Sequence, residues 1–310
     1  MHFTFRLLVV CCIALVLADN ETTAAEGGYS NYIPGSYGDF GMAIAPSETW
    51  TLRNDVYFYD ASTTTSVRSG NLEVGVDLEF IMDFTTLLYK PDIKIFGAQF
   101  ATGVFVPIVH LDLGSDLSIG DTTIAVSDSA TGLGDIAVIP FALYWNEGHI
   151  HTSFAQFIVT PTGDYDVDNL INRGLNYWSF DTNLAVTYLN QESGRDFSFN
   201  IGHIYNTEND DTDYQSGQEL HVDIVLNQFL SETFAVGLHG YYLDQITGDS
   251  GRGALLGDFK AESAGIGPAL LWTRKFGKQD VSIVAKWLHE LHAENRLEGD
   301  HIYVSFAMDW

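Results

Sequence analysis

The sequence predicts an all-β fold, an antiparallel transmembrane β-barrel of about 12 strands preceded by a cleaved signal peptide. Three observations predict it. The last ten residues alternate strictly between apolar and smaller or polar side chains, the connections between strand-like runs alternate in length, and the first residues are typical of an exported chain. Taken alone, the last strand could also be the edge strand of a soluble β-sandwich. A soluble sandwich does not explain the alternating connection lengths or the first residues typical of export.

The first 25 residues have the pattern of a signal peptide. Arg6 precedes an unbroken apolar run at residues 7–17, which is too short to span a bilayer as a helix, and small residues stand at 23–25. Both cysteines, Cys11 and Cys12, fall in this segment, so the mature chain is expected to hold no disulfide. No later run has eighteen uninterrupted apolar residues, so no transmembrane helix is expected.

Residues 26–48 form an irregular amino-terminal segment before the barrel, which is predicted at residues 49–310. The segment contains five glycines, Pro34 and Pro46, and four aromatic residues, and it shows no strand or helix period. It cannot form a core of its own, but flexible backbone and aromatic rings can lie against a polar barrel wall. We expect either a plug in the periplasmic mouth or a disordered lead-in.

About 12 strand-like runs follow, each with alternating apolar and polar positions. They lie at residues 50–59, from 71 onward, and at 93–108, 133–145, 150–160, 177–189, 197–205, 218–229, 233–245, 261–276, 281–291 and 301–310. Long connections at 60–70, 111–132, 161–175, 207–217, 247–260 and 293–299 alternate with short ones near 90–92, 146–148, 190–194, 230–232 and 277–280. Outer-membrane barrels have this rhythm, with long outer loops and short periplasmic turns, and it places both termini in the periplasm.

The final strand also fits a barrel, because a barrel closes its last strand on its first and leaves no exposed edge. One face of this strand is apolar, with Ile302, Val304, Phe306, Met308 and Trp310. Its aromatic ending resembles the carboxy-terminal signal that the bacterial barrel-assembly machinery reads. We therefore expect that machinery, outer-membrane lipid and lipopolysaccharide among the partners of the chain.

The polar side of each strand predicts the lining of the lumen. An Arg or Lys that faces lipid at mid-membrane costs about 2–4 kcal/mol, so charged side chains are expected to point inward. They either neutralise one another or form a selective path for a solute. The predicted lumen-lining residues are Arg53, Asp55, Tyr57, Glu73, Asp77, Glu79, Asp181, Asn183, Glu219, His221, Asp223, His239, Tyr241, Lys286 and Glu290.

The net charge of the chain limits the kinds of partner that it can bind. Asp and Glu number 41 against 14 Lys and Arg, and the formal net charge is −27, which argues against nucleic acid as a partner. The loop residues Asn209, Asp211 and Asp213 offer oxygen atoms that suit calcium, although the spacing is not that of an EF-hand. Solvated loop charge is the alternative, and no other cofactor is expected.

No motif points to an enzyme. The histidines of His289-Glu290-Leu291-His292 are three apart rather than four and lie in a strand pattern, so they do not match a metalloprotease helix. His149 and His151 directly follow a tight turn, where a solvated pair is the simpler interpretation. The run from Gly265 to Pro268 lacks the third glycine of a nucleotide-binding loop and is better explained as a bend in a strand.

Several blocks of the sequence resemble a known family. The runs 172–180 and 185–189, then 206–209, 212–214 and 216–221, and finally 286–287, 294–296 and 298–300 are similar to blocks of outer-membrane proteins linked to meta-pathway phenol degradation, which are described as transporters. The likeness extends from about residue 26 to 310, with Leu288 standing where a polar residue is expected. The residues that carry it in loops and at strand ends are Asn172, Arg173, Gly174, Asn176, Tyr177, Trp178, Asp213, Tyr214, Glu294, Asn295 and Arg296.

The resemblance implies a barrel in the Gram-negative outer membrane that lets small hydrophobic or aromatic compounds pass. About 12 strands give a lumen between the filled 8-stranded barrels and the open 16-stranded porins. Since no ATP motif is present, we expect passive passage. The alternative is a non-transport barrel, structural or surface-binding, whose acidic loops carry the function.

Overall fold

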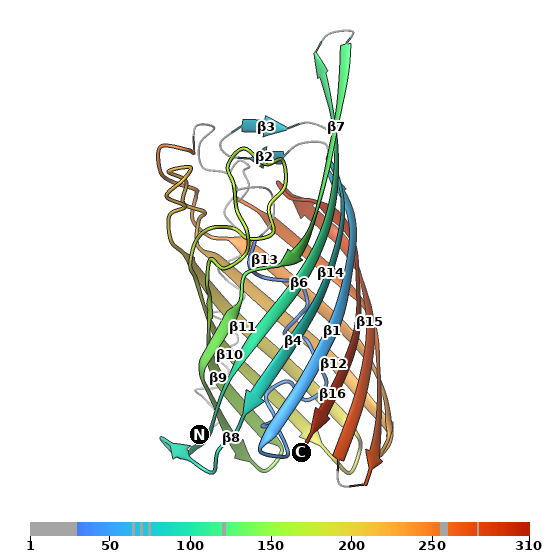
Figure 1. The fold of residues 1–310 in the computed structure, drawn as a ribbon. Coiled ribbons are helices and arrows are strands. Elements are labelled where there is room, and N and C mark those ends of the chain that lie inside the picture. Colours follow the sequence, from blue (N-terminus) through green and yellow to red (C-terminus); the bar gives the residue numbers. More distant parts are fainter. Residues whose placement is uncertain are drawn as a thin grey trace, which may run out of the picture.

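The computed structural model describes residues 30–63, 66–68, 71–73, 76–119, 122–254, 260–277 and 279–310. The predicted signal peptide, residues 1–25, lies outside the described residues. Twelve long antiparallel strands form one closed sheet, with β1 hydrogen-bonded to β16 on one side and to β4 on the other, which confirms the predicted barrel (Figure 1). No helix in the described part of the chain is long and apolar enough to cross a membrane.

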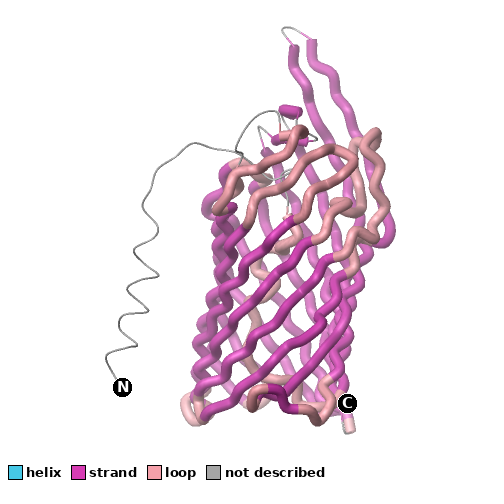
Figure 2. Tube along the Cα trace, turned by 90° about the vertical axis from the view of Figure 1, so that its left-hand side faces the viewer, coloured by secondary structure: helices cyan, strands magenta, loops and turns pink. Residues whose placement is uncertain are grey.

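The barrel strands follow one another around the wall in sequence order. They are β1 (Trp50–Thr63), β4 (Val76–Tyr89), β6 (Ala98–Ile119), β8 (Ala137–Glu147), β9 (Ile150–Val159), β10 (Ser179–Asn190), β11 (Arg195–Asn206), β12 (Glu219–Ser231), β13 (Phe234–Gln245), β14 (Glu262–Phe276), β15 (Gln279–Glu294) and β16 (Glu298–Asp309). Short turns gather at one end of the barrel and long loops at the other (Figure 2).

The alternation seen in the sequence separates an outer from an inner face. On β16, Ile302, Val304 and Phe306 are each more than 40% exposed, whereas Tyr303 and Ser305 between them are buried inside. The closing pair places Trp50 beside Trp310 through two backbone hydrogen bonds, and Tyr89 lies across from Trp50 on β4. These aromatic side chains mark the turn end of the apolar outer surface, as an interfacial girdle does.

A row of carboxylates marks the other boundary of this surface. Asp300, Asp60, Glu79 and Asp112 stand opposite one another on β16, β1, β4 and β6. Asp60 is ten residues from Trp50 along β1, which is about 33 Å of strand and about 25 Å of depth at a tilt of roughly 40°. That depth matches the apolar band of an outer-membrane barrel.

Two predicted connections are wrong in part. Residues 111–132, expected as a loop, continue β6 upward into a hairpin with β7 (Thr122–Leu133) that stands above the barrel (Figure 1). Along this part of β6, Leu alternates with Asp or Ser, and this strand pattern continues beyond the barrel. Similarly, β2 (Ser66–Arg68) and β3 (Asn71–Glu73) form a separate hairpin, and β5 (Lys94–Ile95) pairs only with the start of β6.

Candidate functional site

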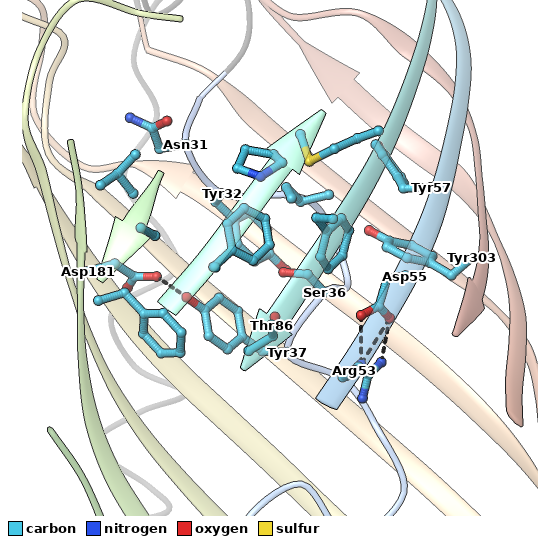
Figure 3. Close-up of a pocket in the computed structure, with 18 of the residues that line it drawn as sticks. Asn31, Tyr32, Ser36, Tyr37, Arg53, Asp55, Tyr57, Thr86, Asp181 and Tyr303 are labelled. Carbon is cyan, nitrogen blue, oxygen red and sulfur yellow. Dashed lines mark hydrogen bonds and ion pairs between the residues drawn. The ribbon is translucent and has the colours of Figure 1, made fainter. Parts of the chain in front are cut away.

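The interior of the barrel holds the amino-terminal segment, and the upper part of that segment is anchored by two aspartates. The hydroxyl of Tyr37 donates to Asp181 at 2.5 Å (Figure 3). The hydroxyl of Tyr32 donates to Asp223 at 3.1 Å. His221 lies between them, 3.1 Å from Asp181, and its ring stacks on Tyr32 at 4.2 Å and on Tyr37 at 5.0 Å. Burial raises the pKa of both tyrosines, and the carboxylates raise it further, so the phenols remain protonated donors.

A lysine on the wall holds the bend of the segment. Lys286 Nζ donates to the carbonyl oxygens of Gly35 at 2.6 Å and of Gly38 at 2.8 Å, and it lies 4.4 Å from the centre of the Tyr303 ring. The Tyr303 hydroxyl donates to the carbonyl of Pro34 at 2.5 Å. Backbone carbonyls of an irregular segment are thereby satisfied inside the barrel, where an unpaired one would be costly.

An ion-pair cluster lies below this bend. Arg53 on β1 pairs with Asp55 at 2.8 Å (Figure 3). It also pairs with Asp39 of the segment. Burial alone would raise the pKa of Asp39, but the charges of Arg53 and Lys286 hold it below its ordinary value. Asp39 is therefore ionised at neutral pH, and the carboxylate ties the segment to β1.

The lower part of the segment continues toward the turn end. Gly41 N donates to Asp196 at 2.7 Å, and Ala43 N donates to Thr187 at 3.1 Å. Ser47 Oγ then donates to Asp309 at 2.7 Å. At the opposite end, Asn31 contacts Ser179 at 2.6 Å. The segment thus runs along most of the lumen, further than the periplasmic mouth in which the sequence interpretation placed it.

A cavity of about 530 Å³ remains between the segment and the other half of the wall. Strands β10 to β16 supply most of the polar anchors, whereas β4, β6, β8 and β9 turn mainly apolar side chains inward. The lining residues from these four strands include Leu78, Phe80, Met82, Phe84, Leu88, Phe105, Pro107, Val109, Leu111, Ala137, Ile139, Ala142, Tyr144, Ala155, Phe157 and Val159. Met42 and Ile44 of the segment close the cavity from the other side.

Of the four cations that line this cavity, three have acceptors, and the fourth, Arg296, is buried with no hydrogen-bond partner for its Nε among the described residues. Arg53 is paired with two aspartates and Lys286 with two carbonyl oxygens, while Arg173 pairs with Asp164 and donates to the carbonyl of Thr131 at 3.1 Å. The cavity therefore combines an apolar wall with polar groups that are largely satisfied by one another. Such a site suits a neutral solute better than an anion.

Most of the residues expected in the lumen do lie on the inner face. They are Arg53, Asp55, Tyr57, Asp181, Asn183, Glu219, His221, Asp223, His239, Tyr241, Lys286 and Glu290. The expectation for Asp77 and Glu79 is wrong: both are exposed on the outer side of β4, because Val76 and Leu78 take the inner positions of that strand. Glu73 belongs to the separate β2–β3 hairpin rather than to a barrel strand.

Sequence reasoning missed several inner residues. His301 links Tyr57, at 2.7 Å, to Glu290, at 3.2 Å, and Tyr59 donates to Glu290 at 3.1 Å. Asp196 was also not expected inside. The alternation on β16 that identified the lipid face could have found His301 and Tyr303, since they occupy its other side.

The comparisons with known proteins agree with this architecture. A family model described as "Putative MetA-pathway of phenol degradation" matches residues 57–306. The chain belongs to this family. None of the curated proteins compared with the chain matches it.

A solved structure of an outer-membrane barrel shares the fold. The COG4313 outer membrane channel from Pseudomonas putida F1 superposes with a TM-score of 0.61 at 14% identity, over 89% of this chain and 99% of that one. A FadL homologue from Pseudomonas aeruginosa superposes with a TM-score of 0.42 at 8% identity, over 93% of this chain and 98% of that one. At 14% identity, the likeness to the COG4313 channel concerns the fold alone.

The family-motif residues between β9 and β10 hold that long loop against the end of the barrel. Asp135 accepts hydrogen bonds from the backbone amides of Thr162, Gly163 and Leu175, at 2.7–3.0 Å. Burial raises the pKa of Asp135, and these three amides oppose the shift. A Cβ added to Gly174 would lie 2.6 Å from Asp135 Oδ1, so the close approach requires glycine. Asn172 adds two hydrogen bonds to the backbone of Asp166.

The other motif residues also shape loops and strand ends. Asn176 donates to Asn209 at 2.8 Å and to Asp211 at 3.0 Å, whereas Asp213 pairs with Arg252 at 2.6 Å. The three residues expected to hold calcium thus contact other residues of the protein. Asn209 and Asp211 share Asn176 as a donor, whereas Asp213 contacts Arg252 instead. Among the remaining motif residues, Tyr177, Tyr214 and Arg296 are buried, whereas Trp178 faces outward. Glu294 is the last residue of β15, and Asn295 follows it.

Leu288, which departs from the family pattern, contacts the segment directly. Its side chain is fully buried, and a Cβ added to Gly35 would lie 2.3 Å from Leu288 Cδ1. Gly35 also has a φ of +80°, a conformation that costs other residues about 1–2 kcal/mol. Glycine at this position thus allows the segment to turn against Leu288.

We expect Gly35→Ala to loosen the segment and to raise the single-channel conductance of the barrel in planar bilayers. Combining it with Leu288→Ala removes the clash but not the backbone strain, so conductance should return part of the way. Gly97→Ala is the matched control, because Gly97 has a φ of +79° with no atom within 4 Å of the added Cβ. If Gly97→Ala raised conductance as much as Gly35→Ala, the contact with Leu288 would not matter.

Proposed function

We propose that this protein is an outer-membrane channel for the passive passage of small, neutral, hydrophobic or aromatic compounds. The observation that carries the proposal is the cavity between the segment and the apolar inner faces of β4, β6, β8 and β9. Its volume of about 530 Å³ lies in the range of small-molecule sites and accommodates a single-ring compound with room to move. Aromatic side chains such as Phe84, Phe105 and Phe157 offer ring faces to such a solute.

Membership of a family named for phenol degradation and likeness to an outer membrane channel both support this function. The proposal places the turn end and both termini in the periplasm, with the long loops outside the cell. It also places the row Asp300–Asp60–Glu79–Asp112 at the level of lipopolysaccharide headgroups, where divalent cations bridge carboxylates and phosphates. The aromatic end of β16 is the segment that the barrel-assembly machinery would read.

Narrowing the cavity tests the proposal. Ala155 lines the cavity, so Ala155→Trp should fill part of it and reduce uptake of a neutral single-ring compound such as phenol or toluene several-fold in cells that depend on the channel. Phe154→Trp is the matched control, because Phe154 is the preceding residue on β9 and faces lipid opposite Leu184. Equal uptake by the two variants, with equal amounts in the outer membrane, would contradict passage through this cavity.

A further inference from the structure

A buried arginine at the loop end of the barrel lacks a hydrogen-bond acceptor. Arg296 lies in the connection between β15 and β16, lines the cavity and is only 5% exposed. Its Nε has no hydrogen-bond partner, and its guanidinium forms no ion pair with any described residue. Because arginine stays charged at any pH that a cell encounters, the protein keeps a strong donor beside a largely apolar cavity.

The backbone on both sides of Arg296 is fixed, so its place at the cavity is built into the turn. Asn295 has a φ of 56°, a left-handed conformation that asparagine adopts more readily than most residues. Its Nδ2 donates to the carbonyl of Lys260 at 3.1 Å. On the other side, the carbonyl of Leu297 accepts from the Tyr59 hydroxyl at 2.7 Å. The turn thus holds the arginine at the cavity although its guanidinium has no acceptor there.

The carboxylate of Glu290, which acts on Arg296 by charge, is occupied by other donors. Its Oε1 accepts from the Tyr241 hydroxyl at 2.6 Å. Its Oε2 accepts from the Tyr59 hydroxyl at 3.1 Å and from the backbone amide of Gly299 at 2.6 Å. Glu290 therefore balances the charge of Arg296 from a distance and leaves the hydrogen bonds of the guanidinium unmade.

These surroundings favour a neutral acceptor over an anion. Glu219, which is also buried, acts on Arg296 by charge as Glu290 does. An anion bound to Arg296 would meet the carboxyl groups that already balance the guanidinium, and it would be repelled. A neutral oxygen atom accepts a hydrogen bond without that repulsion, and a hydrogen bond from a charged donor is stronger than one between neutral groups.

Apolar side chains lie at the same level of the barrel as this arginine. Tyr59, which is bonded to the residue after Arg296, stands opposite Phe80 on β4, and Phe80 stands opposite Leu111 on β6. Phe80 and Leu111 both line the cavity. An aromatic ring that packs against them therefore lies level with the guanidinium, toward which an oxygen substituent on the ring can point.

We propose that Arg296 is a specificity-determining residue, which donates a hydrogen bond to an oxygen atom of a neutral aromatic solute in the cavity. The preferred solutes are then single-ring compounds that carry a ketone, aldehyde or hydroxyl oxygen, ahead of plain aromatic hydrocarbons and aromatic carboxylates. This inference rests on the proposed function, because it concerns the solute that occupies the same cavity.

Binding to the barrel in lipid nanodiscs, measured by ligand-observed NMR and corrected for partition into empty nanodiscs, tests the role of Arg296. Acetophenone and isopropylbenzene are matched in size and differ in the oxygen acceptor. The unaltered barrel should bind acetophenone about tenfold more tightly, which is the effect of one hydrogen bond to a charged donor. Benzoate should bind more weakly than acetophenone.

Arg296→Met removes the donors and keeps a long, unbranched side chain. It should lower the affinity for acetophenone about tenfold and leave that for isopropylbenzene nearly unchanged, which also shows that the cavity is intact. Arg296→Lys, which keeps the charge and a donor, should give an intermediate affinity for acetophenone. Arg252→Met is the matched control, because Arg252 pairs with Asp213 in the outer loops and does not line the cavity. It should change neither affinity.

Equal affinities of the unaltered barrel for acetophenone and isopropylbenzene would overturn the role of Arg296 and leave the proposed function standing. An acetophenone affinity that Arg296→Met does not change would have the same consequence. Tighter binding of benzoate than of acetophenone would overturn the preference for a neutral solute. Binding of neither aromatic compound would contradict the proposed function and this inference together.

Discussion

Deleting residues 30–45 should raise the single-channel conductance of the barrel several-fold. These residues run along the lumen from the contact of Asn31 with Ser179 down past that of Ala43 with Thr187. Their removal leaves Asp181, Asp223 and Lys286 without their partners in the segment, and water fills the space because these groups are strongly hydrated. Planar-bilayer recordings and liposome swelling with small sugars would both report the change.

Assembly must be shown separately, because the same deletion removes many hydrogen bonds. The closed ladder from β1 to β16 does not use these residues, so the variant should still migrate as a folded barrel before heating. A deletion of similar length in the β6–β7 hairpin above Gly114 is the control, since that hairpin stands outside the lumen. An unchanged conductance in a folded barrel lacking residues 30–45 would mean that the segment does not restrict the path.

Placing an arginine at Ile224 should strongly impair insertion. Ile224 is 47% exposed, faces outward and lies about midway along β12, so the guanidinium would enter hydrocarbon at a cost of about 2–4 kcal/mol. The amount of heat-modifiable barrel in the outer membrane should fall sharply. Normal levels of folded Ile224→Arg would show that this face of β12 does not contact lipid.

His221→Arg on the same strand is the matched comparison. The new charge would lie between Asp181 and Asp223, so insertion should proceed. The variant loses the stacking of the imidazole on Tyr32 and Tyr37, however, and arginine needs more room than histidine where the site is fully buried. We therefore expect a folded barrel with a loosened segment and raised conductance, a different defect from that of Ile224→Arg.

The alternation of side chains was enough to predict the barrel, its strand number and most inner positions. A period of two assigns each residue to one of two faces, and a strand such as β12 has one correct register once its apolar face is known. The same rule failed on β4, where Asp77 and Glu79 lie outward. A carboxylate that faces outward costs little beyond the apolar band, and Asp77 and Glu79 lie at or above its upper boundary.

The sequence by itself determined the fold class, the strand order, the lipid-facing apolar surface and the presence of an irregular segment before β1. Only the tertiary structure decided which groups meet inside. Tyr32 and Asp223 are 191 positions apart, and Lys286 and Gly35 are 251 apart. Such contacts form because the closed barrel brings distant strands around one lumen. The alternation of side chains within a single strand carries no information about which distant residues meet there.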